Sequence, residues 1–172
     1  MQGKTIAIPV SRNALRGLAR QVRVLADCED SLYFDIVRFV EQDLYRWDSE
    51  YEFEVVERAT MGDCHGRTYP DKHKIEIRED VYENAVAGKG RDRLTIAHEV
   101  GHYLLHESEN LALARAECIP DYRDPEWQAT AFGGELLVPA HLVQGMTVEE
   151  VAEKCGVSLP SARYQLAKQK KR

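Results

Sequence analysis

The sequence contains no apolar run long enough to cross a membrane, and its first residues, MQGKTIAIPVSRN, lack the apolar core of a signal peptide. Cysteine is scarce, and no two cysteines form a C-x-x-C pair; the four are Cys28, Cys64, Cys118 and Cys155. Without an export signal, cysteines this far apart indicate reduced thiols rather than a disulfide framework. We therefore expect a cytoplasmic protein.

An excess of positive charge is also missing. Lys and Arg number 23 against 29 Asp and Glu, which gives a formal net charge of −6. This balance argues against a chain whose main task is to coat nucleic acid, although it leaves room for a local basic patch. Internal repeats are absent too. With 172 residues, 44% of them apolar, the chain fits one soluble domain or one domain with a small appendage.

Two helices are predicted within residues 11–47, where apolar positions recur three and four residues apart. They cover residues 12–26 and 31–47. On the side opposite its apolar face, the first helix carries a basic stripe, here named the arginine stripe, which consists of Arg12, Arg16, Arg20 and Arg23. A solvated helix face is the favoured interpretation of this stripe, and a contact surface for an acidic partner or a phosphate is the alternative.

The pattern changes after the second helix. The segments YEFEVV (51–56) and HKIEIRE (73–79) alternate as half-buried strands do. The glycine-containing segment between them is predicted to be a loop with a short strand at Arg67–Tyr69. A short helix over residues 79–87 follows, and it ends at a glycine.

Capping signals define the helices that come next. A helix is predicted over residues 91–106, and the segment LALARAE after it indicates a further helical turn or two before irregular chain. Asp124-Pro125 is a good start for a helix over residues 125–138, with Asp as the N-cap and Pro at the first helical position. Both helices lie in the half of the chain that carries the histidine-rich motif described below.

The C-terminal segment predicts a pair of short helices. Thr147-Val-Glu-Glu150 is a capping box whose helix ends near Gly156, and Ser158 is placed to cap a second helix. We therefore divide the chain into a domain over residues 1–140, with its sheet within 51–79, and a helix-turn-helix-like appendage over 141–172. Helices around a small, mostly antiparallel sheet make the predicted fold class α+β.

The stretch TIAHEVGHYLLHES, residues 95–108, carries the metal-binding signature H-E-x-x-H. On a helix, His98 and His102 lie about 40° apart around the axis and about 6 Å along it, so both can direct a ring nitrogen at one ion about 2.1 Å away. Glu99 lies about 100° further round, where it can accept a proton from a water molecule bound to that ion. Gly101, between the two histidines, is expected to face a closely passing backbone such as a strand.

A helix that is merely rich in histidine is the alternative. Apolar residues surround the motif, so the helix is expected to be buried on more than one side; they are Ile96, Ala97, Val100, Leu104 and Leu105. Buried histidines need partners, and a metal ion supplies one. The surroundings therefore favour the metal site.

Two histidines leave a catalytic zinc ion one protein ligand short. His106 stands a further turn along, about 80° round from His98, so a structural hydrogen bond is favoured for it over a place in the metal site. Glu126, in the first turn of a predicted helix, is the better candidate because the helix dipole favours a carboxylate there. On spacing alone, Glu126 competes with Asp121, Asp124 and Glu117.

Two long motifs in order, TIAHEVGHYLLH and EWQATAFGGELLVP, with the tail VEEVAEKCGVSLPSARYQL, resemble the ImmA/IrrE family of metallo-endopeptidases. The resemblance implies a zincin-like fold of the gluzincin type. It implies a zinc ion, which manganese can replace, on His98, His102 and Glu126, with Glu99 as the general base. It also implies site-specific cleavage of a helix-turn-helix transcriptional repressor, in the control of mobile elements or stress responses.

One departure from the family pattern is Gly133-Gly134, where many relatives carry alanines. Each glycine weakens a helix by about 1 kcal/mol relative to alanine. The pair therefore either loosens the wall of the cleft, at a cost in activity, or admits a close backbone.

Other residues are eligible for supporting roles. A second donor to the oxyanion is sought at Tyr69, His73 or His141, with a structural role as the alternative for each. In the segment Asp63-Cys64-His65, a Cys64 thiolate that reached the zinc would hold the enzyme latent. Exposed polar loop is the favoured interpretation of that segment.

Two other functions compete with proteolysis. A metal-containing regulator would control its partner by binding alone, although a purely structural metal site has no need of Glu99. DNA binding is indicated by the five basic residues and no acids of residues 159–172, but the helix before them is acidic at Glu149, Glu150 and Glu153. Packing against the protease core is the favoured role of these C-terminal helices.

Overall fold

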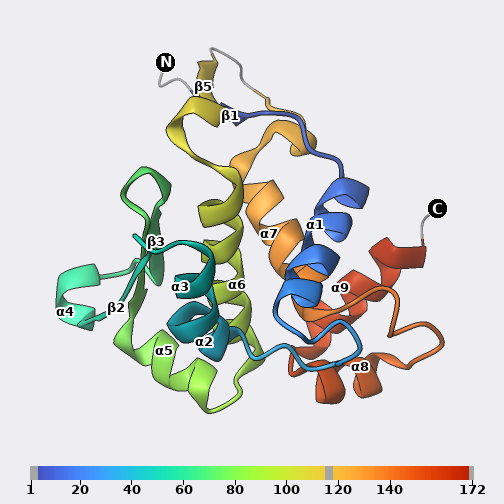
Figure 1. The fold of residues 1–172 in the computed structure, drawn as a ribbon. Coiled ribbons are helices and arrows are strands. Elements are labelled where there is room, and N and C mark those ends of the chain that lie inside the picture. Colours follow the sequence, from blue (N-terminus) through green and yellow to red (C-terminus); the bar gives the residue numbers. More distant parts are fainter. Residues whose placement is uncertain (1–3, 115–117, 171–172) are drawn as a thin grey trace.

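The computed structural model describes residues 4–114 and 118–170, and two long helices pack against each other through its centre (Figure 1). They are α6 (Gly90–Leu105) and α7 (Pro125–Leu137). Fully buried apolar side chains line both helices, among them Ile96, Ala97, Val100, Phe132, Leu136 and Leu137. No helix within the described ranges has the length and apolarity that a membrane crossing requires.

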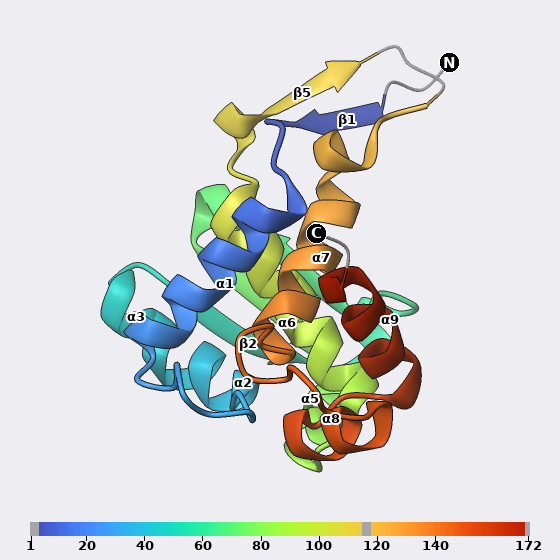
Figure 2. The same ribbon diagram turned by 90° about the vertical axis from the view of Figure 1, so that its right-hand side faces the viewer.

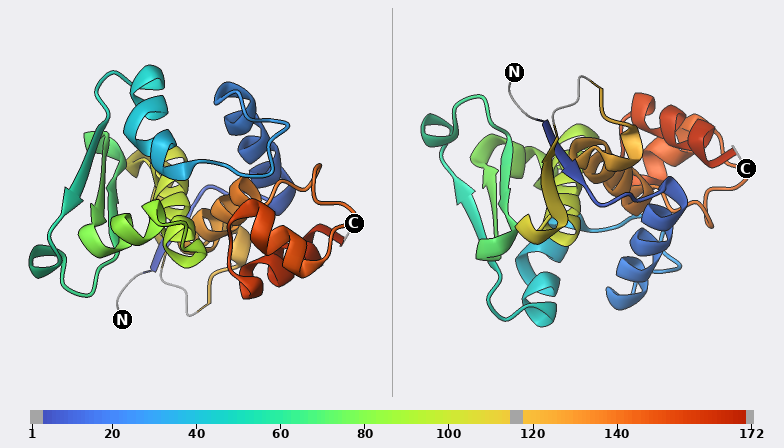
Figure 3. Two further views of the ribbon diagram at one scale, coloured as in Figure 1. Left: turned by 90° about the horizontal axis from the view of Figure 1, so that it is seen from below. Right: turned by 90° about the horizontal axis from the view of Figure 1, so that it is seen from above.

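A three-stranded sheet covers one side of α6, with the strand order β2-β4-β3 (Figure 3). β2 (Glu52–Val56) runs parallel to β4 (Lys74–Arg78), whereas β3 (Gly66–Tyr69) runs antiparallel to β4. The isoleucines of the central strand, Ile75 and Ile77, are fully buried in the core. β3 is an edge strand of this sheet, and it lies against α6.

Short elements complete this half of the molecule. Five of them are α2 (Ile36–Arg38), η1 (Phe39–Asp43), α3 (Leu44–Trp47), α4 (Arg58–Met61) and α5 (Glu79–Val86). Three helical turns join longer elements: η2 (Pro70–Lys72), η3 (Ser108–Asn110) and η4 (Asp121–Arg123). α5 packs on α6 and closes the core below the sheet (Figure 1).

The other half of the molecule is built on α7. α1 (Arg12–Leu25) packs along α7, and α9 (Leu159–Lys170) lies beside it (Figure 2). α8 (Val148–Cys155) pairs with α9. At one end of the molecule, β1 (Lys4–Ala7) and β5 (Leu111–Ala114) form an antiparallel ribbon.

The predicted fold class, α+β, is confirmed, since helices surround short strands. The sheet within residues 51–79 is mixed rather than mostly antiparallel, because β2 pairs with β4 in parallel. Predictions from local signals are confirmed as well. The capping box at Thr147 forms both of its hydrogen bonds, and Asp124 caps α7. The short strand predicted at Arg67–Tyr69 is β3.

Two predictions of helix are corrected. The helix predicted over 31–47 begins at Ile36, and its middle is the π-type turn η1. The segment LALA, predicted to be helical, is the strand β5, because it pairs with β1 and the pairing overrides local helix propensity. The remaining residues of that predicted turn, 115–117, lie outside the described ranges.

The arginine stripe is not a solvated face. Arg12 and Arg16 of α1 pair with Glu135 of α7, at N–O distances of 3.2 and 2.9 Å, and the Glu135 side chain is fully buried. The hydrogen bond to Glu135 raises the pKa of the Arg16 guanidinium above its ordinary value. These ion pairs attach α1 to α7.

A third arginine of the stripe is buried outright. Arg23 is 1% exposed, and its Nε–H donates to the carbonyl of Leu136 at 2.8 Å. Burial lowers the pKa of Arg23 to about 10, so the side chain stays cationic at neutral pH. Arg20 keeps a side chain that is 57% exposed, and it pairs with Glu29. The favoured interpretation was therefore wrong for three arginines, because α7 supplies acceptors that the sequence of α1 cannot reveal.

The C-terminal helices share the core of the rest of the chain. Val151, Cys155 and Ala162 are buried in one apolar cluster with residues of α6 and α7. Gln165 of α9 is 3% exposed and lies so close to α7 that a Cβ added at Gly134 would stand 1.4 Å from its Nε2. The boundary proposed at residue 140 thus separates two segments that pack around the same core.

The neighbouring glycine, Gly133, also has a close contact, on the side of α6. A Cβ added at Gly133 would lie 3.2 Å from the carbonyl carbon of Ala97 and from the backbone nitrogen of His98. Of the two interpretations of Gly133-Gly134, the structure supports the close backbone. The glycines let α7 pack tightly on α6 on one side and on α9 on the other.

The two central helices also approach each other closely at Gly101, where a Cβ would lie 2.9 Å from both the Cα and the carbonyl oxygen of Ala129. The close backbone expected there is thus a helix rather than a strand.

Gly101→Ala should lower the free energy of unfolding by about 1–3 kcal/mol, because overpacking outweighs the gain in helix propensity. Gly17→Ala is the matched control: Gly17 lies within α1 and a Cβ there meets nothing within 4 Å, so this change should stabilise by about 0.4–1 kcal/mol. Urea unfolding measures both, and a Gly101→Ala protein as stable as the wild type would show that the helices can separate freely.

Candidate metal centre

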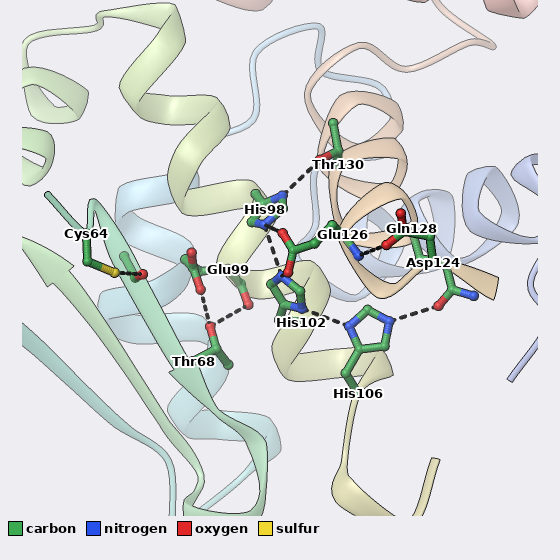
Figure 4. A network of polar contacts seen from close by, with 11 residues as sticks. Cys64, Thr68, His98, Glu99, His102, His106, Asp124, Glu126, Gln128 and Thr130 are labelled. Carbon is green, nitrogen blue, oxygen red and sulfur yellow. Dashed lines mark hydrogen bonds and ion pairs between the residues drawn. The ribbon is translucent and has the colours of Figure 1, made fainter. Parts of the chain in front are cut away.

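Three side chains from the two central helices meet at one point (Figure 4). His98 and His102 stand one turn apart on α6, and their Nε2 atoms are 3.0 Å apart. Glu126 comes from the first turn of α7, with Oε2 3.2 Å from Nε2 of His98 and Oε1 3.1 Å from Nε2 of His102. Among the described residues, these three form the group whose ligand atoms all lie within 4.8 Å of one another.

The donor set fits a divalent metal ion. Two imidazole nitrogens and one carboxylate oxygen form a set that catalytic zinc uses, and ligand atoms at tetrahedral angles about 2.0–2.1 Å from zinc are separated by about 3.3 Å. The measured separations of 3.0–3.2 Å are close to that value. The Glu126 side chain is 72% exposed, so the cluster is open to solvent and to a substrate.

Charge at the cluster is dominated by Glu126. Hydrogen bonds from the rings of His102 and His98 hold the pKa of the Glu126 carboxyl well below its usual range. The carboxylate is therefore ionised throughout the neutral pH range. An anionic oxygen beside two imidazole nitrogens is a favourable arrangement for a divalent cation.

The other nitrogen of each histidine has a partner of its own. Nδ1 of His98 lies 3.0 Å from the hydroxyl of Thr130 on α7. Nδ1 of His102 lies 2.9 Å from Nδ1 of His106, and Nε2 of His106 lies 2.8 Å from Oε1 of Gln128. His106 thus makes the structural hydrogen bond expected of it rather than joining the cluster. It is 4% exposed, and burial lowers its pKa.

Glu99 lies on the β3 side of the two histidines (Figure 4) and is 7% exposed. Its Oε2 is 2.6 Å from the hydroxyl of Thr68 on β3. Gly66 of the same strand leaves room for the side chain, since a Cβ there would lie 2.7 Å from Cγ of Glu99. The edge strand therefore positions the glutamate of the H-E-x-x-H motif.

Two of the acidic residues that competed with Glu126 on spacing, Asp124 and Asp121, do not join the cluster. The Asp124 side chain accepts the backbone N–H of Glu126 at 2.9 Å, so it caps the helix that carries the ligand. Asp121 belongs to the turn η4. Glu117 lies outside the described residues.

Two of the candidates for the oxyanion donor are held elsewhere. Nδ1 of His73 lies 2.5 Å from Oδ2 of Asp48, and this contact raises the pKa of His73. Nε2 of His141 bonds the carbonyl of Glu29 at 2.8 Å. His141 follows the C-terminal end of α7, which at 1.5 Å per residue is roughly 16 Å from Glu126. Both histidines are thus engaged by other partners in this structure.

The third candidate and the cysteine lie on or beside β3. Tyr69 follows Thr68, and since successive side chains of a strand point to opposite faces, Tyr69 points away from Glu99. The Cys64 thiol donates to the carbonyl of Gly66 at 3.0 Å and is not part of the ligand group. The idea of a thiolate on the metal gains no support from this placement.

Thr68, Gly66, Thr130 and Gln128 are parts of the site that the sequence interpretation missed. Each acts through a partner at least 22 residues away along the chain. Gln128 and Thr130 were within reach of inference, because they lie on the same helix as Glu126, two and four residues on. For Thr68 and Gly66, no motif or periodic pattern in the nearby sequence indicated a contact with Glu99.

No curated protein matches the chain. A family model does: the IrrE N-terminal-like domain of the Peptidase M78 family matches residues 54–167. The matched segment begins in β2 and ends in α9, so it contains most of the three-stranded sheet, both central helices and every residue of the cluster. The M78 family is one of metallopeptidases, and its domain has a zincin-like fold. The chain belongs to the Peptidase M78 family, as its two motifs indicated.

Proposed function

We propose that this protein is a zinc-dependent endopeptidase that cleaves a specific protein substrate. Membership of a peptidase family supports the class of reaction. The observation that carries the proposal is the placement of Glu99. It follows His98 in the sequence, and Thr68 of β3 holds its carboxylate by a hydrogen bond beside the solvent-exposed cluster. A structural metal site has no use for this carboxylate, whereas peptide hydrolysis needs a base.

In this proposal His98, His102 and Glu126 hold the metal, with zinc as the natural ion and manganese as a substitute. When bound, zinc supplies Lewis-acid polarisation of the scissile carbonyl and lowers the pKa of water towards about 7. The three ligands would contribute one negative charge, from Glu126, against the two positive charges of a divalent ion. Once Glu99 has accepted its proton, a net positive charge would remain to stabilise a developing oxyanion.

Glu99 acts as the general base: it accepts a proton from the attacking water and passes it to the leaving amine. Thr68 can hold the carboxyl group in both protonation states. Its hydroxyl lies 2.6 Å from Oε2 and 3.1 Å from the backbone carbonyl of Glu99, so its hydrogen has two acceptors to choose from. When Glu99 carries the proton, the hydroxyl turns its hydrogen to the carbonyl and accepts from the carboxyl group.

An extended substrate has a natural place along β3. In the order β2-β4-β3, this strand is paired on one side only, and it lies beside the helix that carries the cluster. Backbone hydrogen bonds to such an edge hold a peptide without regard to its side chains. Gly66 and Thr68, which contact Glu99, belong to this strand. A bound peptide would therefore run past the base.

The substrate we propose is a helix-turn-helix transcriptional repressor, as the family resemblance implies. Cleavage of one repressor requires that the enzyme recognise a particular partner by docking. The arginine stripe, one of two surfaces considered for this docking, is largely committed to Glu135 and to backbone carbonyls within the fold. The C-terminal helices are the surface that remains to be tested.

Co-incubation with the repressor encoded beside this gene tests the proposal. We expect two fragments from a single cut in protein loaded with zinc or manganese, no appreciable action on casein, and an uncut repressor with Glu99→Gln. An intact repressor that forms a stable complex with the wild-type protein would favour the alternative, a metal-containing regulator that acts by binding alone.

A further inference from the structure

We propose that His106 and Gln128 are positioning residues that fix His102 in the one tautomer able to bind a metal through Nε2. The inference rests on the proposed role of His102 as a ligand, and it assigns a task to two buried residues outside the ligand group. Gln128 is 1% and His106 4% exposed. The chain of contacts runs from two backbone carbonyls through Gln128 and His106 to His102, and Figure 4 shows its last two contacts.

The chain begins at Gln128, whose amide has only one acceptable orientation. Its Nε2 lies 2.8 Å from two backbone carbonyl oxygens, those of Ile8 and Tyr122. Carbonyl oxygens only accept hydrogen bonds, so both amide hydrogens are donated to them. A flipped amide would set its oxygen against both carbonyls. Oε1 is therefore the atom that faces His106.

The orientation of Gln128 determines which nitrogen of His106 carries the hydrogen. Oε1 of Gln128 accepts, so Nε2 of His106, 2.8 Å away, must donate. A neutral imidazole has one N–H, which leaves a lone pair on Nδ1. That lone pair faces Nδ1 of His102 at 2.9 Å, so Nδ1 of His102 is the donor. With its hydrogen on Nδ1, His102 can offer a lone pair to a metal ion only from Nε2, the atom that faces His98 and Glu126.

The other histidine lacks such a constraint. Nδ1 of His98 faces the hydroxyl of Thr130, which can donate or accept, so either tautomer of His98 keeps this hydrogen bond. The two proposed ligands therefore differ. The position of the ring hydrogen of His102 is fixed by a chain of hydrogen bonds that starts at backbone carbonyls, whereas His98 can carry its hydrogen on either nitrogen. Val10 donates its N–H to the same Tyr122 carbonyl at 2.9 Å, so the anchor joins the segment after β1 to the one before α7.

Long-range nitrogen–proton NMR of the metal-free protein tests the inference without any substrate. Each histidine ring shows which of its nitrogens carries the hydrogen. We expect hydrogen on Nδ1 of His102 and on Nε2 of His106. A wild-type spectrum without hydrogen on Nδ1 of His102 would overturn the proposal. This result stands whether or not the protein proves to be a peptidase.

Zinc affinity, measured by competition with a chelator, provides the second readout. His106→Leu removes the acceptor and should weaken zinc binding by about 10- to 100-fold, with both tautomers of His102 visible by NMR. His106→Asn, whose side-chain oxygen can replace Nδ1 as the acceptor, should retain most of the affinity. Thr130→Val should weaken binding less than His106→Leu. Equal zinc affinity in the leucine variant and the wild type would reduce His106 to a purely structural role and contradict the proposal.

Discussion

Glu99→Gln should lower the rate of peptide cleavage by about 10²- to 10⁴-fold while zinc content and thermal stability stay near those of the wild type. The amide keeps the shape of the side chain, and its oxygen can still accept the hydrogen bond from Thr68, which now lies 2.6 Å from Oε2. It cannot take a proton from water. The loss should therefore fall on the chemical step, as a decrease in kcat with little change in KM.

Glu83→Gln, on the exposed surface of α5, is a matched control with the same change of charge and should cleave normally. Metal analysis and a turnover assay on the same preparations separate chemistry from architecture. Cleavage by Glu99→Gln at a rate near that of the wild type would show that another group is the base.

Glu126→Ala should cost both the metal and the activity. This substitution removes the one anionic ligand of the proposed site. Mutation of residues that only support the ligands lowers metal affinity by up to about 100-fold, so loss of a ligand should lower zinc affinity further. His98→Ala and His102→Ala should empty the site in the same way and lower the thermal stability of the zinc-loaded protein. Equilibrium dialysis followed by metal analysis measures the loss.

Two neighbouring carboxylates serve as controls for Glu126. Asp121→Ala should keep the metal, because this residue lies in η4 and outside the ligand group. Asp124→Ala removes the N-cap of α7 and should cost about 1 kcal/mol of stability, yet leave the three ligands in place. Zinc bound as tightly by Glu126→Ala as by the wild type would refute the assignment, and loss of zinc in Asp121→Ala would move it to that residue.

The parts of the fold and of the site that could be predicted are those that depend on residues close together in the sequence. The i, i+4 spacing of His98 and His102 places both on one face of a helix wherever that helix lies. Asp124-Pro125 fixes the start of α7 and hence puts Glu126 in its first turn. The two motifs were also enough to identify the family, and the match to the family model confirms it.

The parts that were missed depend on contacts between distant segments. Glu135 in α7 forms ion pairs with two arginines of α1. The sequence of α1 shows only that these arginines lie on one face of the helix. The segment LALA is a strand because β1 lies beside it, more than 100 residues earlier in the chain. Thr68 matters because β3 passes along α6 at Glu99. Side chains of this kind have no periodic or capping signature, so only the assembled fold reveals their partners.

The claim that His98, His102 and Glu126 hold one divalent metal is tested most directly by a crystal structure of the zinc-supplemented protein, with data collected on both sides of the zinc absorption edge. We expect a single anomalous peak between α6 and the start of α7, about 2.0–2.2 Å from Nε2 of each histidine and from the Glu126 carboxylate. A peak at Cys64 and His65 instead, or a fully occupied zinc site that leaves Glu126 unliganded, would contradict it.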